Sequence, residues 1–399
     1  MKIAHFSPLP PQKSGIASYS AYLLPYLAQF ADLTLFTDQI HQLDETLSQQ
    51  FPIRESKSFA GPLAEGFDVS LYHMGNNAKY HSQIYELLCR YPGIVVLHDT
   101  NLHSFFGEYL MKQGQFAAYT REMAFAYGPT GLNHAQQAHF QRTPFDVKRF
   151  PLFERVVQKS LGIIVHNQYS KKLIERHCSR QTVAHIPHLM PPIDRLPAQA
   201  EAKALLGYRP DDILLASFGY VSPSKRIHVV LEALASLRSR ASLPRVHYAL
   251  VGQVVEGYNL QSLLQQLNLE NVVSLVGYAD ETHFRSYLAA VDIAINLRYP
   301  TLGETSGTLM ALMAAAKPLL VSNIDAFAEL PDNICVKIGT GKDEQAEIEA
   351  ALLRLIGNPA QRQELGQRAF TFASEVGNPL VIAQKQVEFV AKIINDSNE

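Results

Sequence analysis

The chain has 399 residues, of which 47% are hydrophobic and 18% are charged, so it is long enough to form two or three globular domains. Lysine and arginine number 35 against 37 aspartates and glutamates, and the net charge of −2 argues against a general nucleic-acid-binding protein. The three cysteines, Cys89, Cys178 and Cys335, lie far apart and are odd in number. They form neither a disulfide framework nor a zinc-binding pattern, which favours a reducing compartment.

No apolar run approaches the roughly 18 residues that a membrane-spanning helix requires. Residues 1–6 lead directly into a predicted strand, without the charged and then apolar regions of a signal peptide. We therefore expect a cytoplasmic protein rather than an integral membrane or secreted one. Peripheral contact with the inner face of the membrane stays open.

Short apolar runs alternate with segments of helical periodicity, and continuous apolar runs favour a parallel sheet that is covered on both faces. In the first half we predict strands at residues 2–6, 33–36, 69–72, 94–97 and 162–165, with helices at 18–30 and 83–90. Residues 182–204 contain four prolines and are predicted to form an irregular linker.

The pattern restarts after this linker. We predict strands at residues 213–219, 246–251, 272–275, 293–295 and 319–321, and helices at 226–237, 260–267, 281–289 and from 306. The fold class that follows is α/β, with two doubly wound, Rossmann-like domains that face a cleft. The first domain covers residues 1–190 and the second residues 191–378, and residues 379–399 form a C-terminal helix that packs back toward the first domain.

Ligands of such sheets bind at the carboxyl ends of the strands, so a site is expected in the loops that follow them. The glycine-rich turns of dinucleotide-binding and P-loop proteins are absent, as are Asp-x-Asp, Cys-x-x-Cys and His-Glu-x-x-His motifs. We therefore expect no metal ion and no cofactor, and an anionic ligand held by backbone amides and basic side chains.

Three loops each open a predicted helix, where free N–H groups and the helix dipole attract an anion. The first loop carries Ser14 and Gly15, the second Lys225 and Arg226, and the third residues 303–308. Two adjacent cations are unfavourable at a helix start, and a phosphate beside them would explain their position. The alternative for the first loop is an ordinary strand–helix connection with a serine as helix cap. The alternative for the second loop is that its two cations simply point into solvent.

In the third loop, a carboxylate and a run of small residues combine two kinds of contact. Glu304 is suited to bind hydroxyl groups, while Thr305, Ser306, Gly307 and Thr308 offer amide donors to an anion. For Glu304 the alternative is to complement the dipole of its own helix.

His98 and Asp99 follow the predicted strand at 94–97. At a strand end, an adjacent histidine and aspartate can bind a sugar hydroxyl or change the properties of a neighbouring group. A purely structural histidine is the alternative. Further polar residues follow the strand at 69–72 and are expected to line the same cleft: His73, Asn76, Asn77 and His81.

Taken together, these motifs resemble those of the GT-B retaining glycosyltransferases of family 4. The matching motifs are Ser14-Gly15, Leu97-His98-Asp99, Gly219 with Lys225-Arg226, Gly303-Glu304-Thr305-Ser306-Gly307 and Ala316-Lys317-Pro318. The resemblance implies a nucleotide-diphospho-sugar, most often a UDP-sugar, held mainly by the second domain without a metal. It also implies a saccharide or lipid-linked acceptor bound by the first domain, in polysaccharide or glycoconjugate biosynthesis.

The resemblance further implies a role for each residue. The catalytic residues would be His98 near the reacting carbon, Lys225 at the leaving diphosphate and Glu304 on the donor-sugar hydroxyls. The substrate-binding residues would be Ser14, Gly15, Asp99, Arg226, Gly277, Tyr278, Thr305, Ser306, Gly307 and Thr308, with Gly277 and Tyr278 beside the base. Because no pair of carboxylates is placed for double displacement, we expect front-face attack with retention, in which the departing phosphate takes the acceptor proton.

The sequence departs from the family pattern at two places. Tyr220 stands where the family has an arginine, and the second carboxylate of a Glu-x7-Glu motif falls on Leu312 or, in the register set by Pro318, on Ala311. Both departures support an alternative, namely a non-catalytic saccharide-binding or scaffold protein of the same fold. A sugar-nucleotide epimerase and a pyridoxal-phosphate-dependent phosphorylase are further alternatives.

Residues 105–159 form a helical, aromatic segment that ends in basic residues, and they allow two interpretations. The aromatic residues are Phe105, Phe106, Tyr109, Phe116, Tyr119, Phe125 and Tyr127, and the basic ones are Arg142, Lys148, Arg149, Arg155 and Lys159. They form either core and solvated surface or the wall of a cleft for a lipid-linked or polymeric saccharide near an anionic membrane.

Overall fold

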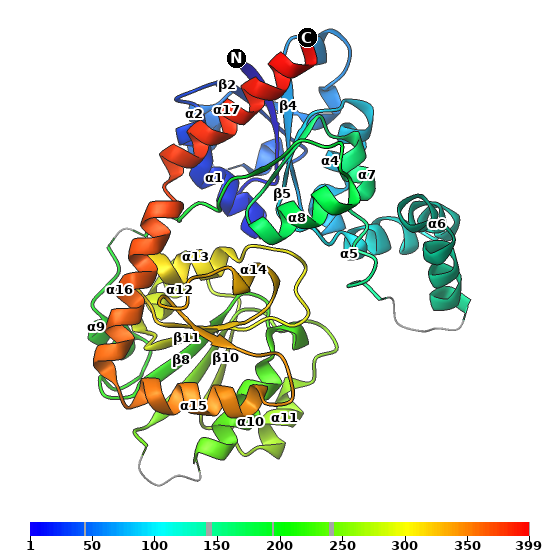
Figure 1. Cartoon of the computed structure of the whole chain (residues 1–399). Helices are drawn as coiled ribbons and strands as arrows, with labels where there is room; N and C mark the ends of the chain where they lie inside the picture. The colour runs from blue at the N-terminus through cyan, green and yellow to red at the C-terminus, as the bar shows by residue number, and fades with distance from the viewer. Residues whose placement is uncertain (44, 141–145, 194, 239–242, 399) are drawn as a thin grey trace. The chain divides into compact units, whose positions relative to one another are not determined.

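The computed structural model describes the whole chain except residues 44, 141–145, 194, 239–242 and 399. It divides into two compact units (Figure 1). Unit 1 comprises Met1–Leu189, Leu302–Thr305 and Gly377–Glu399, and unit 2 comprises Met190–Thr301 and Ser306–Val376. The chain therefore passes from one unit to the other four times, and a four-residue insert from the second half of the sequence belongs to unit 1.

Within the described residues, unit 1 contains a seven-stranded parallel sheet in the order β3-β2-β1-β4-β5-β6-β7. Its strands are β1 (Lys2–Phe6), β2 (Asp32–Thr37), β3 (Ile53–Glu55), β4 (Val69–Met74), β5 (Ile94–Leu97), β6 (Gly162–Val165) and β7 (Val183–His185). The first strand lies inside the sheet between β2 and β4, and the order reverses beside it, as in doubly wound folds.

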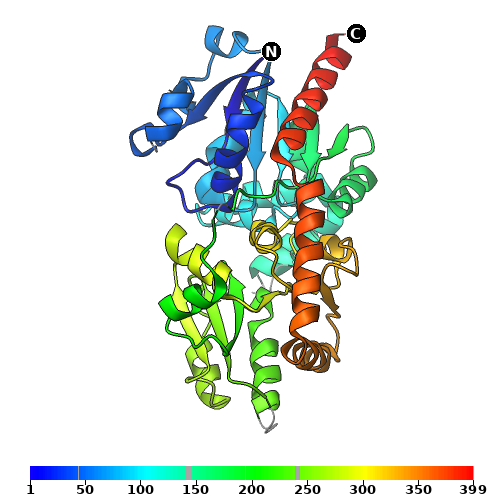
Figure 2. The same cartoon turned by 90° about the vertical axis from the view of Figure 1, so that its left-hand side faces the viewer.

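Helices cover both faces of this sheet. They are α1 (Gly15–Leu27), α2 (Glu45–Gln50), α3 (Pro62–Glu65), α4 (Ala78–Arg90), α5 (His103–Phe106), α6 (Phe116–Phe140), α7 (Glu154–Lys159), α8 (Gln168–His177) and α17 (Pro379–Asn398), with short turns η1 (Ile40–Gln42), η2 (Ser56–Ser58) and η3 (Gly107–Met111). Successive β1 residues enter different cores: Ile3 packs with residues of α1 and α17, whereas Ala4 and Phe6 pack with those of α4 to α7. The C-terminal helix α17, red in Figures 1 and 2, thus completes unit 1.

Unit 2 repeats this architecture. Its described residues form a six-stranded parallel sheet in the order β10-β9-β8-β11-β12-β13. The strands are β8 (Ile213–Phe218), β9 (Val246–Val251), β10 (Val273–Gly277), β11 (Ile293–Asn296), β12 (Leu319–Ser322) and β13 (Val336–Ile338). The helices are α9 (Gln199–Leu205), α10 (Ile227–Arg238), α11 (Leu260–Gln266), α12 (Glu281–Ala290), α13 (Gly307–Ala314), α14 (Asp325–Ala328), α15 (Glu344–Ile356) and α16 (Pro359–Val376), with the turn η4 (Pro223–Lys225). The predicted fold class, two doubly wound α/β units, is confirmed.

The predicted linker at 182–204 is wrong at both ends. Residues Val183–His185 form the edge strand β7, which pairs with β6 before the first proline is reached, and α9 begins two residues after Pro197. The prolines therefore confine the irregular segment to the stretch between these elements, and the chain enters unit 2 at Met190.

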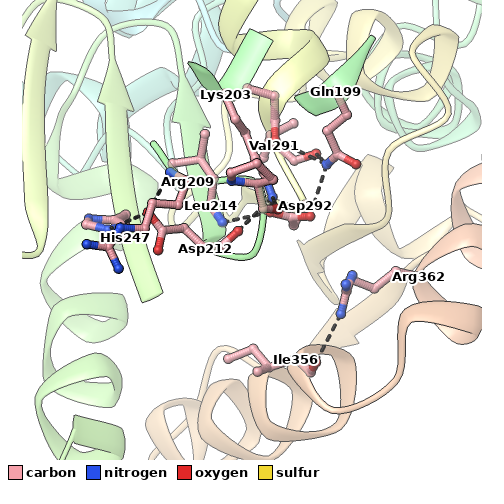
Figure 3. Close-up of polar contacts among 12 residues, drawn as sticks. Gln199, Lys203, Arg209, Asp212, Leu214, His247, Val291, Asp292, Ile356 and Arg362 are labelled. Carbon is pink, nitrogen blue, oxygen red and sulfur yellow. Dashed lines mark hydrogen bonds and ion pairs between the residues drawn. The ribbon is translucent and has the colours of Figure 1, made fainter. Parts of the chain in front are cut away.

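A buried polar network holds the amino-terminal edge of the unit 2 sheet together (Figure 3). Lys203 of α9 forms an ion pair of 2.7 Å with Asp292, and its Nζ also donates to the carbonyl of Asp212 at 2.6 Å. Asp292 in turn accepts from Nε2 of Gln199 at 3.0 Å and from the backbone N–H of Leu214 at 2.8 Å. Because these residues precede β8 and β11, the network lies at the edge opposite to the carboxyl ends of the strands and has a structural role.

No described helix is both long enough and apolar enough to cross a bilayer.

Candidate functional site

The loop after β8 brings Lys225 to the carboxyl edge of the unit 2 sheet. Its side chain is only 5% exposed, and Nζ donates to the carbonyl of Phe218, the last residue of β8. Gly219 follows with a φ of +81°, and a Cβ built on it would lie 2.9 Å from Nζ of Lys225 and 3.7 Å from Cγ2 of Thr308. A side chain at Gly219 would therefore occupy the place where the lysine ammonium and the start of α13 converge.

The helix α13 begins beside this ammonium. Ser306 is its N-cap and accepts from the backbone N–H of Leu309 at 3.3 Å, and Oγ of Ser306 also lies 3.0 Å from Oγ1 of Thr308. Nδ2 of Asn296, at the end of β11, donates to Ser306 Oγ at 3.4 Å. The predicted residues Ser306, Gly307 and Thr308 thus form the first turn of a helix whose N–H groups suit an anion.

Arg226 has a different environment from its neighbour. Its guanidinium binds the nearly buried carboxylate of Glu344 with Nε–O distances of 3.0 and 3.1 Å and an Nη2–Oε2 distance of 2.5 Å, and this pairing raises the arginine pKa. The guanidinium carbon lies 5.7 Å from the ring centre of Tyr299. Because Glu344 offsets the charge of Arg226, the predicted contact of this residue with substrate stays a prediction.

The tetrapeptide insert Leu302–Thr305 carries the predicted Glu304 into unit 1. Nδ2 of Asn167 donates to the carbonyl of Gly303 at 3.1 Å and to Oγ1 of Thr305 at 3.0 Å, and the hydroxyl of Ser170 donates to the same carbonyl at 2.9 Å. Oε2 of Glu304 accepts from the backbone N–H of Leu302 at 2.6 Å. Glu304 and Thr305 therefore lie in a loop that unit 1 fixes.

This packing requires glycine at position 303. Gly303 has a φ of +73°, and a Cβ there would lie 1.8 Å from Oγ1 of Thr100.

A row of histidines crosses the carboxyl edge of the unit 1 sheet. His5, His73, His98 and His166 come from or directly follow the adjacent strands β1, β4, β5 and β6, and His188 follows β7. Consecutive ring centres are 4.8, 5.3, 4.9 and 5.3 Å apart. This row lies on the face that α1 and α17 cover.

Tyr19 of α1 covers the histidine row. Its ring centre lies 4.9 Å from that of His98 and 4.8 Å from that of His188, and its hydroxyl accepts from Nε2 of Gln386 in α17 at 3.0 Å. Burial raises the pKa of the Tyr19 phenol, so the hydroxyl stays protonated.

Burial keeps the whole row neutral. It lowers the pKa of His5 and His188 to about 4 and that of His166 to about 3. Burial and then the neighbouring histidines hold the pKa values of His73 and His98 well below the ordinary range.

The other predicted residues of unit 1 are placed around this edge. Ser14 is the N-cap of α1 and accepts from the N–H of Ile16 at 3.3 Å, and Gly15 is exposed at the first helical position. A carboxylate oxygen of Asp99 accepts from the N–H of Asn76 at 2.9 Å, so Asp99 braces the loop after β4.

Asn77 caps α4, and its side chain accepts from the N–H of Lys79 at 2.9 Å, whereas His81 is buried within this helix. These contacts are structural, and the substrate contacts inferred from the resemblance stay predictions.

The base-binding candidates lie at the end of β10. Gly277 forms a bridge with Gly252 at the end of β9, and the ring of Tyr278 is 60% exposed. Tyr220 is 59% exposed. Leu312 and Ala311 are the two positions at which the second carboxylate of a Glu-x7-Glu motif could fall. Both are buried in α13, and neither offers a polar side chain.

Lys317 lies at the amino end of β12, where its Nζ donates to the carbonyl of Ala289 at 2.7 Å and burial lowers its pKa to about 8. This position is opposite the carboxyl ends of the strands, which does not favour the phosphorylase alternative. Within the part of the chain that the structure describes, no group of three or more histidines, cysteines, aspartates or glutamates is placed to hold a metal ion. The expectations on metal and cofactor stay predictions.

Several residues of these sites were not predicted. His5 and His166 could have been predicted from the sequence, because each lies in or directly after a predicted strand, as His73 and His98 do. Asn167 and Glu344 could not have been predicted, since their partners lie more than 100 residues away in sequence.

Residues 199–372 match the family model described as glycosyl transferases group 1. This match covers less than half of the chain. A curated relative, D-inositol 3-phosphate glycosyltransferase 2 of Catenulispora acidiphila, is 27% identical over 188 residues, which cover 44% of this chain and 42% of the relative. The chain thus matches less than half the length of this relative.

Solved structures are similar to this chain over nearly its whole length. Sucrose-phosphate synthase of Thermosynechococcus elongatus is similar with a TM-score of 0.71 at 15% identity, covering 99% of this chain and 100% of that one. HepE of Anabaena, in complex with UDP and glucose, is similar with a TM-score of 0.67 at 18% identity, covering 98% and 100%. At these identities the likeness shows the fold, which is GT-B.

Proposed function

We propose that the chain is a metal-independent, retaining glycosyltransferase that moves a sugar from a nucleotide-diphospho-sugar to a saccharide or lipid-linked acceptor. The observation that carries this proposal is the convergence of the Lys225 ammonium with Gly219 and the first turn of α13, inside the segment that matches the model of glycosyl transferases group 1.

The chemistry follows from this arrangement. When the bond between the sugar carbon and the diphosphate oxygen breaks, negative charge develops on the diphosphate and positive charge on the sugar. Lys225 and the N–H groups of Gly307 and Thr308 stabilise the diphosphate, and one such preorganised donor contributes roughly 2.7 to 4 kcal/mol. The acceptor hydroxyl attacks the same face of the sugar, and the departing phosphate oxygen takes its proton. Glu304 and His98 hold the sugar hydroxyls.

A UDP-sugar is the proposed donor, supported by the UDP and glucose bound in the similar structure of HepE. Of the two cations predicted at the leaving group, we assign this role to Lys225 alone, because Glu344 already pairs with Arg226.

The test combines ligand binding with turnover. UDP should raise the melting temperature to the same extent with and without EDTA, since a ligand at 100 times its Kd stabilises the folded state by about 2.7 kcal/mol. Lys225→Met should lower turnover of UDP-glucose by a factor of about 100 to 1,000. Lys342→Met, which removes an exposed lysine of the same unit, is the matched control.

If no nucleoside diphosphate stabilises the protein, this function is wrong. The alternative, a non-catalytic saccharide-binding or scaffold protein, then applies, in line with the exposed Tyr220 and the apolar Leu312. Stabilisation that EDTA abolishes would instead contradict metal independence.

For the acceptor we propose a lipid-linked or polymeric saccharide at an anionic membrane surface, in polysaccharide or glycoconjugate assembly. The helix α6 projects away from the sheet of unit 1 (Figure 1) and exposes Phe125 and Phe140. The buried Phe105, Phe106 and Tyr119 are core residues instead.

Among the predicted basic residues, Arg155 is paired with an acidic side chain. The guanidinium of Arg155 binds Glu122 at 2.9 Å and covers the ring of Phe125, and Arg142 lies outside the described residues. Sedimentation with anionic and neutral vesicles is the test. Binding that requires anionic lipid and weakens in Phe140→Ser supports the proposal, and equal sedimentation without and with anionic lipid contradicts it.

A further inference from the structure

The ring of His98 makes a direct hydrogen bond to another histidine. Its Nε2 lies 3.0 Å from Nδ1 of His73, and both residues are nearly or fully buried on the same face of the sheet. Because both rings are neutral, one of these two nitrogens carries the proton and the other accepts it.

The second nitrogen of His73 decides between the two arrangements. Nε2 of His73 is buried and has no hydrogen-bond partner among the described residues. If it carried the proton, an N–H donor would be left unsatisfied in the core, which costs about 1–3 kcal/mol. With the proton on Nδ1, that N–H is satisfied by His98, and Nε2 is left as a bare acceptor.

His166 shows the same arrangement in the same row. Its Nδ1 lies 2.9 Å from the carbonyl oxygen of Ile186, which accepts only, so the proton must be on Nδ1. Its Nε2 is buried and, like that of His73, finds no hydrogen-bond partner in the part of the chain that the structure describes. His188 is fixed in the same way, by the carbonyl of Leu189 at 2.8 Å from its Nδ1. The row therefore accommodates a bare, buried Nε2 at His166.

We propose that His73 is a positioning residue that holds His98 in the form protonated on Nδ1, so that His98 donates a hydrogen bond to a hydroxyl oxygen of the bound sugar. The contact with the sugar rests on the proposed function, whereas the tautomer does not. His73 donates from Nδ1, Nε2 of His98 accepts, and the proton of the neutral His98 ring is left on its Nδ1. A neutral imidazole that was free to change tautomer would present a donor only part of the time.

The tautomer is tested on the wild-type protein, without a ligand. With ¹⁵N-labelled histidine, long-range ¹H–¹⁵N correlation spectra at neutral pH distinguish protonated from bare ring nitrogens, and the His98→Ala spectrum assigns the His98 signals. We expect a protonated Nδ1 and a bare Nε2 in His98, and the same pattern in His73. A protonated Nε2 in His98 would overturn the proposal.

Two variants test the consequence for the sugar. His73→Asn keeps an N–H donor near the place of Nδ1, whereas His73→Leu removes it at similar volume. We expect His73→Leu to lower kcat/KM for UDP-glucose about tenfold, the value of about one hydrogen bond, while the Kd of UDP, which has no sugar, is unchanged. His73→Asn should retain most of the wild-type kcat/KM.

Equal losses in both variants, or a weaker affinity for UDP in His73→Leu, would reduce His73 to a structural residue and contradict its positioning role. If His73→Leu fails to fold, the positioning role is still tested by the kcat/KM of His73→Asn relative to the wild type and by the ¹⁵N spectra. If wild-type protein does not turn over UDP-glucose, the proposed function fails for this donor, and the spectra still test the tautomer.

Discussion

The side-chain amide of Asn167 donates to the carbonyl oxygen of Gly303, 136 residues further along the chain, at 3.1 Å. Asn167 is the N-cap of α8, and its Oδ1 also accepts from the N–H of Ser170 at 2.8 Å. One side chain thus completes a helix of unit 1 and holds the loop that carries Glu304.

The first prediction concerns this loop. Gly303→Ala should lower turnover of UDP-glucose at least tenfold, because the new Cβ clashes with Thr100 and the loop must move. UDP should still raise the melting temperature as it does in the wild type. Gly107→Ala is the control, since a Cβ there meets no atom within 4 Å. Full activity of Gly303→Ala would show that the position of Glu304 is unimportant.

The second prediction is an acid-dependent loss of stability in unit 1. The pKa values of His5 and His188 are lowered from 6.5 to about 4 in the folded state, so the unfolded chain binds more protons between these two pH values. The contribution of these histidines to the free energy of unfolding is fully present above about pH 6.5. It falls as the pH decreases toward 4, by up to about 1.4 kcal/mol per pH unit for each histidine.

Denaturant unfolding followed at several pH values measures this slope. His188→Gln should make it shallower, and His139→Gln, which replaces an exposed histidine of the same unit, should leave it unchanged. A free energy of unfolding that is constant from pH 7 to pH 5 would contradict the prediction.

The third prediction concerns the left-handed residue Arg226, whose φ is +59°. Arg226→Ala should destabilise unit 2 more than Arg226→Gly, by about 1 kcal/mol, because glycine adopts this conformation without strain. Both variants leave the carboxylate of Glu344 buried and unpaired, and Glu344→Gln should restore part of the loss in either background. Chemical denaturation of the single and double variants measures these differences. Equal stability of the alanine and glycine variants would show that the backbone conformation contributes nothing.

The fourth prediction concerns the network in Figure 3. Lys203→Met should lower the free energy of unfolding of unit 2 by about 3–5 kcal/mol, because it leaves the buried Asp292 without its cation. Removing the exposed pair of Arg368 and Glu364 in the same unit should change it by at most about 0.5 kcal/mol. A small effect of Lys203→Met in urea denaturation would show that Gln199 and the N–H of Leu214 suffice for Asp292.

The predictable parts of the fold are those with local signals. The strands β1, β5 and β6 begin and end at the predicted residues, because each is a short, mainly apolar segment. The three-residue strands β3, β7 and β13 were not predicted. They are edge strands, and three residues are too few to give a periodic pattern.

The candidate site divides in the same way. The nearness of Lys225 to a strand end and of Ser306 to a helix start is local and was predictable. The pairing of Arg226 with Glu344, 118 residues away, depends on how α10 and α15 pack, which no local pattern encodes. The transfer of residues 302–305 into unit 1 was also unexpected, since their neighbours on both sides belong to unit 2.

The four crossings of the chain between units limit how this chain can be divided or recombined with its relatives. A fragment that stops at Leu189 would lack Ile382, Ala383 and Val390 of α17, which fill the core against α1. It would therefore expose an apolar face and lack the Glu304 insert. A chimaera that takes the whole of unit 1 from a relative must graft three segments together: the N-terminal part, the tetrapeptide and the C-terminal helix. Exchange by a single splice would separate segments that belong to one compact unit.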